Sequence, residues 1–159
     1  MSRSAEVPQF WVDQHRVDFR LAQPDELIDL RHRVLRQGLP RQEAIFPGDD
    51  QPSSRHFGAF TGSRIICCAT FHLEDWQNQP AWRLRGMATE EAFRSRGVGR
   101  ELLACAEQVL RNAGPIRQLW CNARVPAARF YQSLGWMIAS EMFDIPTAGP
   151  HYKMVKKLT

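Results

Sequence analysis

The sequence has no long apolar run, and none approaches the ~20 residues that a helix needs to cross a bilayer. Its first residues also lack the apolar core of a secretory signal. A zinc-binding pattern is missing too, because the four cysteines, Cys67, Cys68, Cys105 and Cys121, form no Cys-x-x-Cys and no His pair completes a site. We therefore expect a cytoplasmic protein without a metal, whose thiols are reduced and buried.

A strong excess of charge is also missing, since the net charge is only +4 and charged residues make up 24% of the chain. So mild a balance argues against nucleic acid as a partner but is compatible with a small anionic ligand. The length of 159 residues and the hydrophobic content of 43% predict one domain with a full core. We place this domain at residues 18–159, after an extension at residues 1–17.

The spacing of apolar residues predicts the order of the strands and helices. One helix should begin at Pro24 and end before Gly38, a second should end at Gly114, and a third should begin at Pro126. A meander of strands comes first and helices alternate with strands later, which predicts a mixed α/β sheet with helices on both faces. The expected strands are residues 18–22, 56–60, 64–73, 82–88, 118–121, 136–143 and 151–157.

The turn between strand 82–88 and the second helix reads Arg-Ser-Arg-Gly-Val-Gly-Arg over residues 94–100. Gly97 and Gly99 allow a sharp turn and let a ligand approach the backbone amides. The start of the helix has free N–H groups, which favour an anion. Together with the three arginines of the turn, these groups predict a phosphate-binding site.

Two well-known phosphate-binding turns do not fit this stretch. A P-loop ends in Gly-Lys-Ser or Gly-Lys-Thr, and a Rossmann fingerprint has a small residue where Leu102 stands. The remaining pattern, Arg94-x-x-Gly97-x-Gly99 after a strand, resembles the acetyl-CoA signature of the Gcn5-related N-acetyltransferase (GNAT) superfamily. A basic surface turn is the alternative on this stretch alone.

A second stretch favours the superfamily. Residues 127–136 read Ala-Ala-Arg-Phe-Tyr-Gln-Ser-Leu-Gly-Trp and resemble its Phe-Tyr-x-x-x-Gly-Phe segment, with Trp136 in place of the usual Phe. The stretch also lies at the expected distance from the glycine turn. The resemblance covers roughly residues 55–158. Within the superfamily, residues 38–40, 46–49 and 149–154 look most similar to the ElaA-like branch.

The resemblance implies a GNAT fold, with a mixed central sheet of about six to seven strands. Strands 82–88 and 118–121 would be parallel and would splay apart to form the acetyl-CoA cleft. The implied enzyme is an acyltransferase that moves an acetyl group from acetyl-CoA, its cosubstrate, to a primary amine by direct transfer in a ternary complex. The acceptor would be a small-molecule or peptide amine, with no nucleic acid or membrane as a partner and with a homodimer left open.

Two alternatives remain. A non-catalytic acyl-CoA-binding sensor or protein-interaction module on the same fold is favoured by strand 82–88, which has Arg83 and Arg85 where the family often has a glutamate. A ping-pong route through a cysteine ranks lower, because no histidine forms an identifiable dyad with a cysteine.

The resemblance also assigns the cosubstrate site. Backbone groups of Met87 and Thr89 would pair with pantetheine, and an amide near Met87 or Ala88 would stabilise the oxyanion. Arg124 stands where the family often has an asparagine, so contact at that loop rests on Asn122. The complete predicted set is Met87, Ala88, Thr89, Arg94, Ser95, Arg96, Gly97, Val98, Gly99, Arg100, Asn122 and Phe130.

Proton transfer needs an acid and a base. Tyr131 matches the family tyrosine that protonates the departing thiolate, although a core-facing residue is the alternative. The base is open between His72, Glu74, His151 and a water relay. We expect the acceptor to bind between the segments 41–54 and 144–151. The acids of these segments would attract a cationic amine, and the alternative is that they only solvate the two loops. These acids are Glu43, Asp49, Asp50 and Asp144.

Overall fold

The computed structural model describes residues 9–159. Its strands form one sheet in the order β1-β2-β3-β4-β5-β6-β9-β7, and β8 pairs with β9. No helix of the described residues is both long and apolar enough to span a membrane. The strands are β1 (Phe10–Val12), β2 (His15–Leu21), β3 (Arg55–Thr61), β4 (Arg64–Leu73), β5 (Trp82–Thr89), β6 (Gln118–Arg124), β7 (Met137–Ile138), β8 (Phe143–Ile145) and β9 (Gly149–Lys157). The helices are α1 (Pro24–Leu35), α2 (Val98–Ala113) and α3 (Ala128–Ser133), with short 3-10 turns η1 (Arg41–Ala44), η2 (Glu91–Phe93) and η3 (Val125–Ala127).

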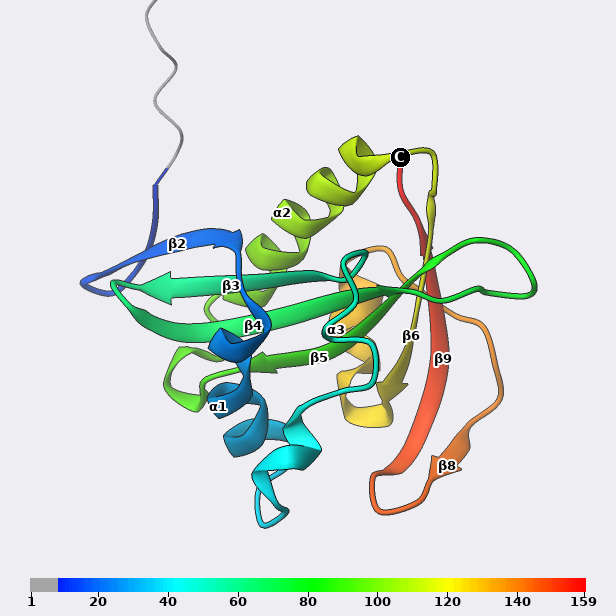
Figure 1. Cartoon of the computed structure of the whole chain (residues 1–159), viewed down its shortest axis with the longest axis horizontal. Coiled ribbons are helices and arrows are strands. Elements are labelled where there is room, and N and C mark those ends of the chain that lie inside the picture. Colours follow the sequence, from blue (N-terminus) through cyan, green and yellow to red (C-terminus); the bar gives the residue numbers. More distant parts are fainter. Residues whose placement is uncertain (1–8) are drawn as a thin grey trace, which may run out of the picture.

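Helices cover both faces of the sheet, as the sequence predicts. In Figure 1, α1 lies in front of the sheet and α2 lies behind it. The larger core fills the α2 side and a smaller core fills the α1 side. Adjacent Cys67 and Cys68 belong to different cores, because successive side chains of a strand point to opposite faces.

The helices follow from local sequence. Pro24 occupies the first turn of α1, and the Glu26 carboxylate accepts a hydrogen bond of 2.8 Å from the Gln23 backbone N–H. The apolar side of α2 packs against β2, β3 and β4, and its residues Val98, Leu102, Leu103, Ala106 and Leu110 are buried. Both helices therefore occupy the predicted stretches.

The sheet is larger than the six to seven strands expected, because the described residues form nine. The excess comes from β1, which was not predicted, and from the predicted strand 136–143, which is replaced by β7 and β8. Each of these three strands has only two or three residues, which is too short for an alternating pattern to be recognised. Residues 136–143 are also not one strand, since β7 ends at Ile138 and β8 begins at Phe143.

The start of the chain contributes more to the sheet than the sequence predicts. Residues 10–17 fall in the predicted extension, whereas β1 pairs with β2 and the side chains of Val12 and Val17 are buried in the core. The rest of that segment, residues 1–8, lies outside the described residues. The division of the chain at residue 18 stays a prediction for those residues.

Strands β5 and β6 are parallel, as predicted, but they pair only at their first residues. The register joins Trp82 with Leu119, Arg83 with Trp120 and Leu84 with Cys121. Beyond these positions the two strands separate, and Figure 1 shows β5 running toward the left while β6 runs toward the bottom. This divergence positions the candidate site.

Candidate active site

A cleft of about 290 Å³ lies where β5 and β6 separate. Its walls come from both strands, the end of α1, the loop after η1, α3 and the β8–β9 hairpin. Among the predicted site residues, the cleft brings together Met87, Asn122, Tyr131 and His151. His72 and Glu74 are not among the residues that line it.

A β-bulge at Gly86 shapes the floor of the cleft. Cys68 pairs with Ala88 and Thr70 pairs with Arg85, so one residue of β4 faces two residues of β5. Gly86 has a φ of +66°, and a Cβ there would lie 2.9 Å from the ring of Phe46. Gly86 is not among the predicted site residues, although a lone glycine inside a strand is a known sign of a bulge.

Beyond Leu84 the edge of β5 that faces β6 has no strand partner in the described residues. An extended ligand can pair with such an edge in the manner of an added strand, through backbone hydrogen bonds. Pantetheine has two amide groups along an extended chain. The edge at Met87 and Thr89 therefore fits the part of acetyl-CoA that the resemblance assigns to it.

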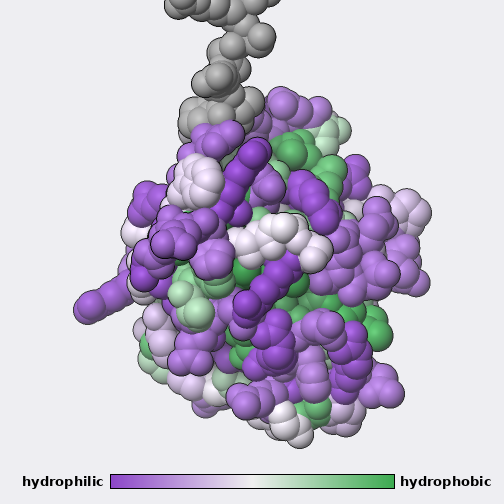
Figure 2. Space-filling view, turned by 90° about the vertical axis from the view of Figure 1, so that its left-hand side faces the viewer, coloured by the Kyte–Doolittle hydropathy of each residue, from purple (hydrophilic) through white to green (hydrophobic). Residues whose placement is uncertain are grey.

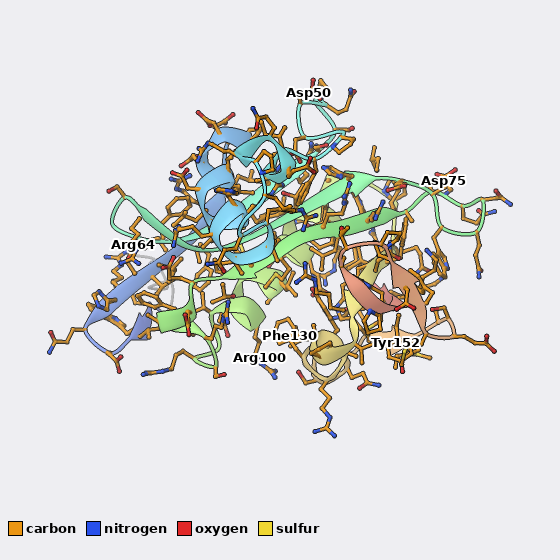
Figure 3. The ribbon with its side chains drawn as sticks, turned by 90° about the horizontal axis from the view of Figure 1, so that it is seen from below. Asp50, Arg64, Asp75, Arg100, Phe130 and Tyr152 are labelled. Atoms are coloured by element: carbon orange, nitrogen blue, oxygen red, sulfur yellow. The ribbon has the colours of Figure 1, made fainter. Side chains whose placement is uncertain are left out.

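The turn before α2 has the geometry of an anion site. Ser95 and Gly97 have left-handed φ values of 60° and 84°, and no side chain caps the first turn of α2. A Cβ at Gly99 would lie 3.0 Å from Met87 Cε and 3.2 Å from Phe130 Cζ. Gly99 thus allows α2 to approach β5 and α3, and Figure 3 shows Arg100 and Phe130 at the same end of the fold.

The arginines of this turn differ in their partners. Arg94 Nε donates to the Thr89 carbonyl at 3.2 Å, and Arg96 pairs with Asp13 at 3.0 Å. Arg100 is exposed and has no ion pair with a described residue. Figure 2 views the molecule from the side of this turn, where hydrophilic residues predominate. Arg100 is therefore the arginine of the turn that is most available to a ligand.

Tyr131 projects from α3 into both the core and the cleft. It is 7% exposed, and its ring contacts those of Phe130 and Trp136 at centroid distances of 5.2 Å and 5.5 Å. Burial raises the pKa of Tyr131 well above its usual range. The hydroxyl therefore stays protonated at neutral pH, as a proton donor requires.

His151 lies on β9, opposite Arg124 of β6, and lines the same cleft. Its Nδ1 is 2.7 Å from the Gly149 carbonyl oxygen, which can only accept a hydrogen bond. The proton of the neutral ring therefore belongs on Nδ1, and Nε2 has the lone pair. Of the three side chains proposed as bases, this is the one in the cleft.

The other two candidate bases have structural partners instead. His72 is buried, and its Nε2 lies 3.2 Å from Asp49 Oδ1. The Glu74 carboxylate pairs with Arg83 at 2.9 Å, and its backbone oxygen accepts from Trp120 Nε1. Neither reaches the cleft, so the geometry favours His151 or water.

The acids expected to attract a cation do not line the cleft either. Asp49 is only 4% exposed and pairs with the fully buried Arg31 at 2.6 Å. Burial alone would raise the pKa of Asp49, but hydrogen bonds from His72 and Arg31 outweigh it and hold that pKa well below its usual range. Asp49 therefore anchors its loop to the sheet. Asp50 lies at the outer tip of the same loop (Figure 3), and Glu43 and Asp144 are exposed.

The cysteines near the cleft are not activated as nucleophiles. Burial raises the pKa of Cys121, which lines the cleft, to about 12, and that of Cys67 to about 11. A nucleophilic cysteine needs a lowered pKa, because the thiolate is the reactive form. These thiols therefore give no support to a ping-pong route.

The comparisons with known proteins agree with the motifs. The model of the Acetyltransferase (GNAT) family matches residues 15–136. The uncharacterized N-acetyltransferase YitI of Bacillus subtilis (strain 168) is 36% identical over 140 residues, which cover 84% of this chain and 91% of YitI.

Two solved structures share the fold. Escherichia coli ElaA matches with a TM-score of 0.73 and 19% identity, over 88% of this chain and 99% of ElaA. An aminoglycoside 6'-N-acetyltransferase complexed with coenzyme A matches with a TM-score of 0.72 and 13% identity, over 89% of this chain and 97% of that protein. At such identities the likeness shows the fold alone, and the ElaA-like branch stays a prediction. The family model and YitI together carry the assignment: the chain belongs to the GNAT acetyltransferase family.

Proposed function

We propose that this protein is an N-acetyltransferase that transfers the acetyl group of acetyl-CoA directly to a primary amine. The observation that carries the proposal is the cleft between the diverging β5 and β6, which has a bulge in its floor and Tyr131 and His151 in its walls. The glycine turn before α2 closes one end of this region with amides suited to the pyrophosphate.

The residues of the cleft divide the reaction between them. His151 accepts at Nε2 the proton that the attacking amine loses, while the amine nitrogen bonds to the acetyl carbonyl carbon. A backbone N–H of the bulge near Met87 stabilises the oxyanion that forms. Tyr131 donates its hydroxyl proton to the thiolate as the C–S bond breaks, and solvent restores the tyrosine proton.

Two substitutions test these roles. Tyr131→Phe retains the ring and its packing, so turnover should fall by about 10²–10⁴-fold while the Kd for acetyl-CoA stays the same. His151→Gln removes the ring nitrogen that accepts the amine proton, so turnover should also fall by about 10²–10⁴-fold. Release of CoA from acetyl-CoA in the presence of an amine panel measures both. Unchanged turnover in both variants, with chemistry rate-limiting, would refute the assignment.

A non-catalytic acyl-CoA sensor remains the second candidate, since no described carboxylate lines the cleft to serve as a base. A sensor would bind acetyl-CoA but release no CoA with any amine of the panel. The cytoplasmic location and the homodimer stay predictions from the sequence.

A further inference from the structure

Four arginine side chains line the cleft, whereas no Asp or Glu of the described residues does. Arg83 and Arg85 come from β5, Arg36 follows the end of α1, and Arg124 ends β6. These segments are far apart in the sequence, so the fold itself brings the like charges together. Close like charges repel, and such a cluster is stabilised by a bound anion.

Three of these guanidinium groups have no carboxylate partner within residues 9–159. Arg83 is neutralised by Glu74, at 2.9 Å. Arg36 donates only to the backbone oxygen of Leu35, at 3.0 Å, and neither Arg85 nor Arg124 has an ion pair with a described residue. Donors therefore remain free on three sides of the cleft.

The cluster is also partly removed from water. Burial lowers the pKa of Arg36 and of Arg85, and neighbouring arginines add to this effect. Glu43 near Arg36 and Glu74 near Arg85 offset only part of it. Both side chains stay charged at neutral pH, because an arginine is effectively always protonated. A partly desolvated guanidinium binds carboxylate or phosphate more strongly than an exposed one.

Phe46 holds two of these guanidinium groups above the bulge. Its ring centroid lies 4.6 Å from Arg85 Cζ and 5.1 Å from Arg36 Cζ. Phe46 is itself buried, and its backbone N–H donates to Asp49 at 2.8 Å. The cationic groups are therefore positioned before any ligand binds.

We propose that the acceptor amine also bears an anionic group, a carboxylate or a phosphate, which Arg36, Arg85 and Arg124 bind. This inference rests on the N-acetyltransferase function proposed above. It replaces the expectation of a cation-attracting pocket, and it excludes polyamines and other purely cationic amines as the preferred acceptors. The arginines have a second effect, because nearby positive charge lowers the pKa of a bound ammonium group. The cluster thus favours the neutral amine that attacks the thioester.

The test compares matched pairs of amines that differ in one negative charge. The pairs are glutamate with glutamine, glycine with glycinamide, and phosphoethanolamine with ethanolamine. For the full-length protein, acetyl transfer gives KM and kcat, and calorimetry with CoA present gives a Kd that needs no turnover. We expect the KM or the Kd to be at least about tenfold lower for the anionic member of at least one pair.

Variants assign this preference to the cleft. The double variant with Arg85→Gln and Arg124→Gln should lose the preference for the anionic amine. The single variant Arg85→Lys retains the charge and should therefore keep much of this preference. Arg64→Gln is the matched control, because Arg64 is exposed and lies far from the cleft. Figure 3 shows Arg64 at the opposite end of the sheet from Tyr152, the neighbour of the cleft residue His151. Thermal unfolding checks that each variant is folded.

Each unfavourable outcome has its own meaning. Equal affinity for both members of every pair, or a preference for the neutral members, would overturn the inference and leave the transferase function standing. A loss confined to acetyl-CoA affinity would assign the arginines to the phosphates of CoA and would also overturn it. Absence of acetyl transfer to every amine, with the binding preference intact, would refute the proposed transferase function alone.

Discussion

Asp49 is the residue whose loss should affect this protein most strongly outside the cleft. Its carboxylate accepts hydrogen bonds from Arg31 at 2.6 Å and 3.2 Å, from the Phe46 backbone N–H at 2.8 Å and from His72 at 3.2 Å. Asp49→Asn retains the shape of the side chain but leaves the buried guanidinium of Arg31 without its counter-charge. The amide NH₂ would also face a group that can only donate.

The burial of the Asp49–Arg31 ion pair determines the expected loss of stability. Removing one partner of a buried ion pair costs about 3–5 kcal/mol. For a chain of this size 1 kcal/mol moves the Tm by about 2–4 °C, so the Tm should fall by about 6–20 °C. Asp50→Asn is the matched control, because Asp50 is the exposed neighbour and should change stability by less than about 0.5 kcal/mol. Urea denaturation with linear extrapolation measures both free energies of unfolding.

The pH dependence gives an independent check on Asp49. Because hydrogen bonds hold its folded pKa well below the ~3.9 of an unfolded aspartate, its contribution is fully present above that value and is lost as the pH falls below it. The wild-type protein should therefore lose stability below about pH 4 more steeply than Asp49→Asn does. A destabilisation under 1 kcal/mol, or equal acid limbs in the two proteins, would refute this account of Asp49.

Three further predictions follow from single positions. Gly86→Ala should lower the free energy of unfolding by about 1–3 kcal/mol because of its φ of +66°, and by more because of the contact with Phe46. Gly62 has a φ of +59° but lies in open space, so Gly62→Ala should show the backbone cost alone. Urea denaturation compares the two variants. Burial lowers the pKa of His56, so the free energy of unfolding should fall as the pH drops below ~6.5, by at most about 1.4 kcal/mol per pH unit. His56→Gln should lose this slope in the same assay. Gly99→Asp places a carboxylate near the expected pyrophosphate and should raise the Kd for acetyl-CoA at least about tenfold in a folded protein. An unchanged Kd in calorimetry would contradict this prediction.

The parts that the sequence predicted well depend on short-range patterns. The stripe of α2 has an apolar residue every three or four positions, and the alternation of β4 fixes which core each cysteine enters. The glycine turn and the Phe130-Tyr131 segment were recognisable because their residues are adjacent in the chain. Local chemistry therefore predicted the fold and the family, while the cosubstrate end of the site stays a prediction.

The parts that it missed depend on contacts between distant residues. Asp49 was expected either to attract a cationic acceptor or only to solvate its loop, because nothing in its own segment reveals that Arg31 and His72 meet it in the interior. The arginine cluster was missed for the same reason, since Arg36 and Arg124 are brought together only by tertiary packing. Charge at a position is visible in a sequence, whereas its partner is not.

The bulge at Gly86 would let one strand contact both proposed substrates. Side chains of a regular strand alternate, so Arg83 and Arg85 should share the α1 face with residue 87. The extra residue reverses the alternation, and Met87 instead packs against the α2 core and Gly99, while Ala88 enters the α1 core. β5 therefore presents arginines to the proposed acceptor side before the bulge and an apolar side chain to the proposed acetyl-CoA side after it. The reacting atoms would meet where these two sides join, beneath the ring of Phe46 that the Asp49 network holds in place.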